Sequence, residues 1–295
     1  MTTSRFTLPP DKLQQFNKDG YFILHDVIDA PTLAMLRDEC SHFVAREDAK
    51  MDALGVDVLD ITHRNKRYHA SYCIRDRPVL GQFAFGPLME EICRTLVGPD
   101  VYLFYDQFVV KGAEAGMKLA WHQDSGYVNA VDGDVAHRPY ITCWCPLDDV
   151  TEENGTVYIL PQSESAIRSA VSHHYDPISN DWVGYDGPLT GVPVSARAGS
   201  VAVFSSLTMH SSGANRTPRL RRVYLTQYSP APVLTADRAM LWGNALPFLR
   251  DGRHVVGSKM PDLPLRIDRL LHAGQKLKDA AARTEKRAAP REDPS

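Results

Sequence analysis

The sequence has few cysteines, no long apolar run and little net charge, and each absence excludes a class of protein. Five cysteines scattered over 295 residues are too few for the disulfide framework of a small secreted domain. No apolar run approaches the roughly 20 residues that a membrane-spanning helix needs, and the N-terminus lacks an apolar signal-peptide core. The net charge of −3 gives no reason to expect nucleic acid or an anionic membrane as a partner. We therefore expect a soluble, cytoplasmic protein, monomeric or homodimeric, that acts on a small molecule.

Cys143 and Cys145 are separated by one residue, a spacing that could in principle bind a metal. A zinc site of this kind would need a second cysteine pair, and the sequence has none. We therefore interpret both cysteines as reduced residues that pack in the core.

No linker, repeat or low-complexity segment interrupts residues 10–270, so the length favours one domain over residues 1–271. Proline and capping signals predict helices at about 10–17, 31–46 and 87–96, with a strand at 21–24, in a helical part that spans about 10–98. Residues 50–80 read as irregular. The composition of residues 272–295 predicts a frayed helix that passes into disorder.

After residue 100 the pattern changes to short segments rich in β-branched and aromatic residues, bounded by Gly, Pro, Asn or Asp. The predicted strands are 101–111, 118–124, 140–147, 156–160, 200–204 and 221–228. This order predicts a mostly β protein, a sandwich or barrel with flanking helices, whose core spans about 100–230. Residues 172–190 show little periodicity and predict a long loop, with bendable ends, that closes over a substrate.

The motif Trp121-His122-Gln123-Asp124 predicts a metal site. In an extended strand His122 and Asp124 point the same way, about 6–7 Å apart. With a third ligand on a neighbouring strand, such as His210, two histidines and one carboxylate would hold one face of an ion, as in non-haem Fe(II) oxygenases. Each piece alone is weak, because a surface triplet or a satisfied core histidine is commoner than a ligand.

Arg221 adds a second requirement, because Val223 and Leu225 share its face of a predicted strand. A buried guanidinium without an anionic partner costs several kcal/mol, and a carboxylate is its natural bidentate partner. A charge on the exposed face of the strand describes Arg219 and Arg222 better. We therefore expect an anion to bind at Arg221.

Together these segments resemble the phytanoyl-CoA dioxygenase family of iron(II)- and 2-oxoglutarate-dependent oxygenases. The matching segments, in the family's order, are residues 16–24, 121–124, 144–155 and 210–215 followed by Arg221. The resemblance spans about residues 12–230 and implies a double-stranded β-helix (jelly-roll, cupin-like) core. It also implies Fe(II) as cofactor, 2-oxoglutarate as cosubstrate and O2 as oxidant.

The resemblance implies that His122, Asp124 and His210 are the iron ligands and the catalytic centre. 2-Oxoglutarate would lose CO2 to give succinate while an unactivated C–H bond of the substrate is oxidised, usually to a hydroxyl. Desaturation, epoxidation or ring formation would need only a different placement of the substrate. The halogenating branch of the family replaces the carboxylate ligand by a small residue, so Asp124 argues against halogenation.

The resemblance also implies a binding site for 2-oxoglutarate. Arg221 would bind its distal carboxylate with help from Ser212, Trp144 would form a wall, and Gln107 would lie near the C1 carboxylate. The residues that we expect to contact the substrate, a natural product or other secondary metabolite, are Tyr68, Tyr105, Tyr127 and Trp182.

Two other functions remain open from the residues alone. A cupin-like isomerase or hydrolase could use the same three ligands with a metal-bound water, but it would not need Arg221. A non-catalytic small-molecule-binding jelly roll would not need a complete set of ligands. For the basic segment 62–69, contact with an anionic substrate competes with an ordinary solvated loop.

Overall fold

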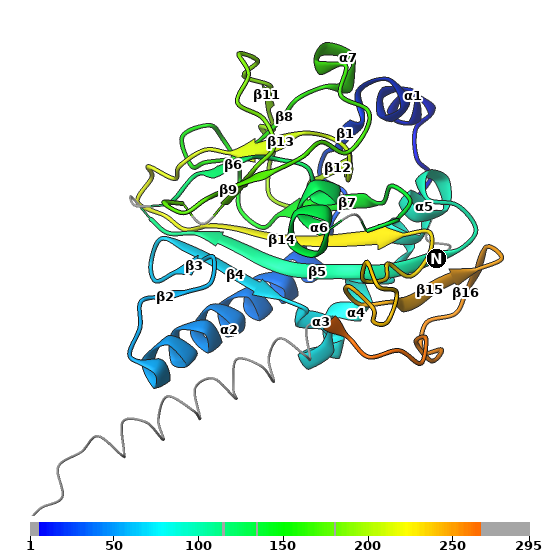
Figure 1. Ribbon diagram of the computed structural model, residues 1–295, viewed down its shortest axis with the longest axis horizontal. Coiled ribbons are helices and arrows are strands. Elements are labelled where there is room, and N and C mark those ends of the chain that lie inside the picture. Colours follow the sequence, from blue (N-terminus) through cyan, green and yellow to red (C-terminus); the bar gives the residue numbers. More distant parts are fainter. Residues whose placement is uncertain (1–5, 114–115, 134, 180, 267–295) are drawn as a thin grey trace, which may run out of the picture.

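Two antiparallel β-sheets face each other, and helices cover the outer face of the larger one (Figure 1). The computed structural model describes residues 6–113, 116–133, 135–179 and 181–266. The tail predicted for residues 272–295 lies outside these ranges. The helices are α1 (Pro10–Asp19), α2 (Ala30–Leu54), α3 (Cys73–Asp76), α4 (Gly81–Ala84), α5 (Pro87–Leu96), α6 (Asp124–Asp132) and α7 (Gln162–Ser165), with a 3-10 turn η1 (Pro78–Leu80).

The larger sheet has ten strands among the described residues. Its main order is β1 (Tyr21–Leu24), β12 (Val201–Ser205), β7 (Ile141–Pro146), β14 (Arg221–Ser229), β5 (Val101–Lys111), β4 (Arg67–Ser71), β3 (Thr62–His63) and β2 (Val58–Leu59), while β15 (Leu246–Arg250) pairs with both β5 and β16 (Arg253–His254). The smaller sheet has the order β11 (Val192–Pro193), β8 (Val157–Ile159), β13 (His210–Ser212) and β6 (Leu119–His122). A separate hairpin joins β9 (His174–Asp176) and β10 (Asp181–Val183).

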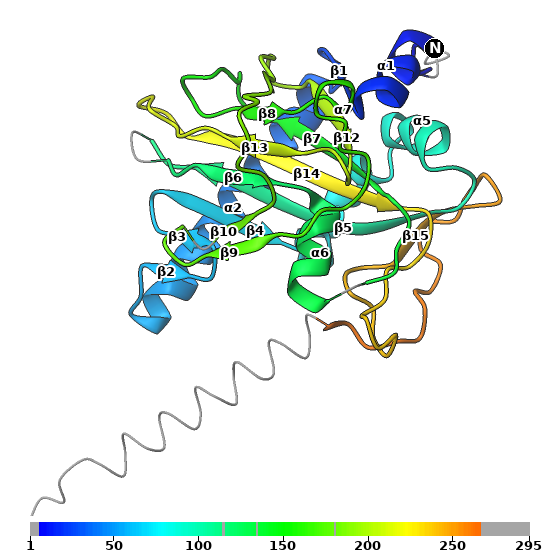
Figure 2. The ribbon, with the colours of Figure 1, turned by 45° about the horizontal axis from the view of Figure 1, so that its top comes forward.

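Alternation along the strands of the larger sheet creates two apolar layers. Phe108 and Tyr224 face outward and pack with helix residues such as Phe43 of α2. Val109 and Trp144 face inward, toward the smaller sheet. Figures 1 and 2 agree that α2 lies on one side of the larger sheet and that β6, β8 and β13 lie on the other. The inner layer is therefore the space in which a site can form between two sheets, as in a jelly roll.

The ends of the helices follow local signals, with one difference. The side chain of Asp29 accepts a hydrogen bond from the Thr32 amide at 2.8 Å, which caps α2. α2 ends at Leu54, eight residues beyond the expected end at residue 46, and Gly55 caps it in the left-handed conformation. The helix continues because Met51 is fully buried against the sheet and Glu47 is paired with Lys50.

Three expectations for secondary structure are wrong, two of them because they depend on pairing between distant segments. Residues 50–80 are not irregular throughout, since β4 pairs with β5 along residues 67–71. The β structure extends past residue 230, where β15 pairs with the other end of β5. Residues 172–190 contain the β9–β10 hairpin and are not a loop without regular structure.

The five cysteines are free and buried, in agreement with their interpretation as packing residues. Cys143 and Cys145 lie on the outer face of β7, on either side of the inward-facing Trp144. Burial raises the pKa of both thiols. No helix within the described ranges is long and apolar enough to cross a membrane.

The contact between sheet and helices can be tested at Phe108, whose ring lies 5.6 Å from the Phe43 ring and 4.6 Å from the Tyr224 ring. Phe108→Ala should lower the free energy of unfolding by about 3–5 kcal/mol, because it leaves a cavity in a closed layer. Ile178→Ala is the control, since Ile178 is 90% exposed, and it should change stability by less than about 0.5 kcal/mol. Equilibrium denaturation measures both; equal effects would contradict the packing described.

Candidate active site

His122, Asp124 and His210 come together at one end of the smaller sheet. His122 ends β6, Asp124 begins α6, and His210 begins β13 directly opposite His122. One ligand atom from each residue lies within 4.8 Å of the other two. The two imidazole rings are 4.1 Å apart, centroid to centroid. The three side chains therefore have the spacing that a single metal ion requires.

Asp124 is not in the strand where the sequence predicted it, because the chain leaves β6 at His122 and enters α6 at Asp124. Gln123 between them is extended, with φ −111° and ψ 141°, so the two ligands still point the same way. The expected strand from 118 to 124 is thus too long, but its consequence for the ligands holds.

Hydrogen bonds fix which nitrogen of each histidine is free. Nδ1 of His122 donates to the carbonyl of Ala120 at 2.8 Å, and Nδ1 of His210 donates to the carbonyl of Thr208 at 3.0 Å. The Nε2 atoms remain as lone-pair donors, and Nε2 of His210 lies 3.8 Å from Oδ1 of Asp124. Burial lowers the pKa of His122 to about 3 and that of His210 to about 4. Both are neutral at pH 7, the form that binds metals.

Asp124 is oriented by the larger sheet. Its Oδ2 accepts a hydrogen bond from the Thr142 hydroxyl at 2.5 Å, and that hydroxyl accepts one from Nε2 of Gln227 at 3.1 Å. Burial raises the pKa of the Asp124 carboxyl, an effect that a divalent cation would offset. The sequence interpretation missed Thr142 and Gln227, although each shares the inward face of its strand with Trp144 or Arg221.

Arg221 is 1% exposed and incompletely paired. Its Nη2 donates to the carbonyl of Gly155 at 3.1 Å, whereas Nε and Nη1 have no partner within the described residues. The guanidinium carbon lies 5.7 Å from the Trp144 ring centre. Burial lowers the pKa of Arg221 to about 9, so it remains a cation at pH 7. A buried cation with two free N–H groups fits the carboxylate of 2-oxoglutarate.

Lys111 is a second buried basic residue, which the sequence interpretation missed. The sheet register places Lys111 of β5 between Arg221 of β14 and Arg67 of β4, in one row across three strands. Its Nζ donates to the carbonyl of Gly213. Burial, followed by the charges of Arg221 and Arg67, lowers the pKa of Lys111 to about 5. Its alternation with Gln107 and Val109 would have placed it on the inward face.

A cavity between the sheets brings the predicted groups together. Its lining includes the three candidate ligands and all four residues that the resemblance assigns to 2-oxoglutarate: Gln107, Trp144, Ser212 and Arg221. The lining also contains His69, whose Nδ1 lies 3.3 Å from Oε1 of Gln107. The geometry therefore supplies one site with a metal end and a cationic end.

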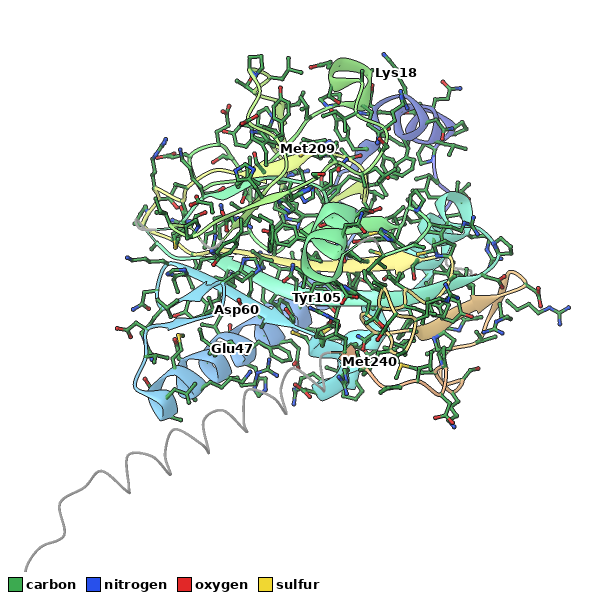
Figure 3. All side chains as sticks on the ribbon, viewed as in Figure 1. Lys18, Glu47, Asp60, Tyr105, Met209 and Met240 are labelled. Carbon is green, nitrogen blue, oxygen red and sulfur yellow. The ribbon has the colours of Figure 1, made fainter. Side chains whose placement is uncertain are left out.

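The four residues expected to contact the substrate lie elsewhere. Tyr68 is on the outer face of β4, where its hydroxyl donates to Asp48 at 2.9 Å, so its assignment to the pocket is wrong. Tyr105 (labelled in Figure 3) faces inward, with its hydroxyl 3.2 Å from Oε1 of Gln107. The Tyr127 ring stands edge-on to His122, 4.9 Å away, and its hydroxyl accepts from the Trp182 amide at 3.3 Å. Tyr105 and Tyr127 thus contact two residues of the cavity lining, Gln107 and His122, and none of the four residues belongs to the lining itself.

The two arginines of the basic segment already have acidic partners. Arg64 forms ion pairs with Asp52 and Asp57 at 2.8 Å each, both with exposed carboxylates. Arg67 is buried and paired with Asp181 at 2.9 Å. For Arg64 the solvated-surface interpretation is therefore the better one, and Arg67 has a structural partner.

The site combines two neutral histidines and one carboxylate with a buried cation that has unpartnered N–H groups. These are the features of a 2-oxoglutarate-dependent metal oxygenase of jelly-roll fold. The chain belongs to the phytanoyl-CoA dioxygenase (PhyH) family, whose model matches residues 16–223. It is therefore an Fe(II)- and 2-oxoglutarate-dependent dioxygenase. This membership decides against the isomerase, the hydrolase and the non-catalytic binding module.

Known proteins agree with this class. The chain is 25% identical over 233 residues to an ectoine dioxygenase of Bordetella parapertussis, covering 72% of each chain. It is 27% identical over 161 residues to an L-proline trans-4-hydroxylase of Streptomyces griseoviridis, covering 48% of this chain and 60% of that one. The fold matches EctD from S. alaskensis, solved with 2-oxoglutarate and 5-hydroxyectoine, with a TM-score of 0.64 and 19% identity over 90% of both chains. It also matches the epimerase SnoN, solved with Fe3+ and alpha ketoglutarate, with a TM-score of 0.61, 20% identity and coverage of 85% and 96%.

The hydrogen bond to Asp124 can be tested at Thr142. Thr142→Val should weaken Fe(II) binding roughly 10- to 100-fold, because the carboxylate loses its orienting donor and Gln227 loses its acceptor. Thr142→Ser keeps the hydroxyl and should bind Fe(II) within about threefold of the wild type. Anaerobic Fe(II) titration followed by calorimetry gives both affinities. Equal affinities for the two variants would show that the hydroxyl does not orient the ligand.

Proposed function

We propose that this enzyme hydroxylates an unactivated C–H bond of a small molecule, a natural product or other secondary metabolite, at an iron held by His122, Asp124 and His210. The observation that carries the proposal is the cavity in which these ligands share their walls with Arg221, a buried cation that has two unpartnered N–H groups. The relatives named for ectoine and L-proline support a small substrate. Within this reading the described chain through β15 acts as one domain, since β15 completes the edge of β5.

Each protein group has a defined task at the metal end. The Nε2 atoms of the two histidines and Oδ1 of Asp124 hold the iron, while the carbonyls of Ala120 and Thr208 keep the imidazoles in the required tautomer. Iron, when bound, would supply the oxidising chemistry that converts 2-oxoglutarate, O2 and the substrate into succinate, CO2 and the hydroxylated substrate, with one oxygen atom of O2 in succinate and the other in the new hydroxyl. The two packed sheets exclude bulk water from the reacting atoms.

The cationic end holds 2-oxoglutarate. Arg221, whose Nε and Nη1 have no partner within the described residues, binds the distal carboxylate, and Ser212 adds a hydroxyl from β13. Lys111, in the neighbouring strand, contributes a second positive charge once the carboxylate offsets its burial. Oε1 of Gln107 already accepts from Tyr105, so its Nε2 is the atom available to the C1 carboxylate. Trp144 forms the wall beneath the chain of the cosubstrate.

The substrate approaches the iron from the side of α6 and β5, where Tyr105 and Tyr127 stand next to the site. The Tyr127 ring packs against the His122 ring, and the Tyr127 hydroxyl accepts a hydrogen bond from the backbone amide of Trp182 in β10. His69 takes the place that the sequence interpretation gave to Tyr68, because β4 directs residue 69 into the cavity.

The metal assignment predicts that His122→Ala, Asp124→Ala and His210→Ala each abolish turnover while the fold is retained. Two ligands do not hold Fe(II) in the required geometry. Anaerobic addition of Fe(II) and 2-oxoglutarate should produce the visible charge-transfer absorbance of the bound pair in the wild type and in none of the three variants. A variant that keeps both this absorbance and succinate production at saturating iron would remove that residue from the ligand set.

The cosubstrate assignment predicts that Arg221→Ala weakens 2-oxoglutarate binding by about 2–5 kcal/mol, or roughly 30- to 5000-fold, with a far smaller effect on iron. Arg222→Ala is the matched control, because Arg222 faces outward and pairs with Asp148 at 2.6 Å. It should lower stability but leave the cosubstrate affinity unchanged. Titration of 2-oxoglutarate against the charge-transfer absorbance measures both. If neither variant changes this affinity, the assignment of Arg221 is wrong.

A further inference from the structure

The β9–β10 hairpin is fastened to the segment that carries the metal ligands. The amide of Ala120 donates to Oδ2 of Asp181 at 3.1 Å, and the amide of Gly184 donates to the carbonyl of Trp121 at 2.7 Å. Between the two ligands, the amide of Gln123 donates to Nε2 of His173 at 3.0 Å. The hairpin and the residues next to it therefore contact residues before and between the first two ligands.

Asp181 of this hairpin forms a buried ion pair with Arg67 of β4, with both side chains at most 3% exposed. Arg67 donates to Oδ1 of Asp181 at 2.9 Å and also to the carbonyls of Ile61, Lys118 and Ser179. Because these bonds use Nε and both terminal nitrogens, the guanidinium has little freedom to rotate. Arg67, a residue of the larger sheet, therefore holds the Asp181 carboxylate in a fixed position.

The second oxygen of Asp181 extends this fixation to the metal site. It accepts from the amide of Ala120, and the carbonyl of the same residue accepts from Nδ1 of His122. One residue of β6 therefore links the ion pair to the imidazole. The chain of contacts runs from Arg67 through Asp181 and Ala120 to the ring that would hold iron.

The neighbouring strand does not hold Ala120 in the same way. β13 pairs with β6 at His210–His122 and at Ser212–Leu119, and the register shifts between these two pairs. The irregularity falls opposite residues 120 and 121. The hairpin therefore supplies a fixed hydrogen bond at the point where the regular ladder is interrupted.

We propose that Arg67 and Asp181 are positioning residues, which set the orientation of His122 through the Ala120 backbone and so tune the affinity for Fe(II). This inference rests on the proposed function, since it takes His122 as an iron ligand. It gives the hairpin a fixed part in the metal site, in contrast to a lid that merely covers it. A buried ion pair often adds little net stability, so the role assigned to this one is the geometry that it imposes.

The test compares Asp181→Asn with Asp176→Asn in the full-length protein. Asp176 is the cross-strand neighbour of Asp181, and among the described residues its carboxylate accepts hydrogen bonds from the Ile178 amide and the Ser179 hydroxyl, both within the hairpin. Asp181→Asn should weaken Fe(II) binding roughly 10- to 100-fold in anaerobic titrations at saturating 2-oxoglutarate. Asp176→Asn should stay within about twofold of the wild type.

A second readout does not depend on the loaded enzyme. In the iron-free protein, the 15N chemical shifts of the His122 ring should report a proton on Nδ1 in the wild type and in Asp176→Asn. In Asp181→Asn they should move toward a mixture of the two tautomers. A hairpin that only contributes to folding would lower the melting temperature without changing either the tautomer or the iron affinity.

The outcomes separate this inference from the proposed function. If the wild type gives no charge-transfer absorbance with Fe(II) and 2-oxoglutarate, the proposed function fails. If the wild type binds iron and Asp181→Asn matches Asp176→Asn in affinity and tautomer, the positioning role alone is overturned. Should Asp181→Asn fail to fold, Arg67→Lys is the deciding variant, because lysine keeps the charge but lacks the several N–H donors of the guanidinium. Unchanged iron affinity and tautomer in Arg67→Lys would overturn the proposal, and weakened iron binding would support it.

Discussion

A guanidinium removed from water keeps its charge only where nearby groups repay the lost hydration. Arg221 is buried between two sheets and donates one hydrogen bond, to a backbone carbonyl. Lys111 lies next to it, and Arg67 lies one strand further on. Within the described residues, the carboxylate paired in this row is that of Asp181, on Arg67. The row therefore carries more positive than negative charge. We infer that this imbalance suits the cavity to an organic anion.

The metal end obeys a different constraint, because its three side chains come from three different elements. β6, α6 and β13 belong to the side of the smaller sheet, whereas the groups that orient Asp124 belong to β7 and β14 of the larger one. The spacing of the sheets, set by inner-layer residues such as Val109, Val223 and Phe204, therefore determines whether the carboxylate meets its threonine. The distance between the two sheets therefore affects both the packing of this layer and the orientation of the Asp124 carboxylate at the metal site.

Local sequence signals predicted much of this structure. β1, β5 and α5 have the expected bounds, since glycine, proline and a change of periodicity mark their ends. Alternation alone distinguished the inward Arg221 from the outward Arg222. Alternation places Lys111, Thr142 and Gln227 on the inward faces of their strands, but the cross-strand register is needed to show that they lie next to the site. Tyr68 was misplaced for the same reason, as its outward direction is fixed by its pairing with Val110. The hairpin was missed because its anchor, Arg67, is more than a hundred residues away.

The burial of the five cysteines has a practical consequence. All five thiols are buried and unpaired, and burial raises the pKa of Cys143 and Cys145, so little reactive thiolate is present at neutral pH. A cysteine introduced at an exposed position would then be the preferred target of a maleimide reagent in the native protein. Ile178, 90% exposed next to the hairpin turn, is such a position. A fluorophore or spin label there would follow the hairpin during turnover without removal of the native cysteines.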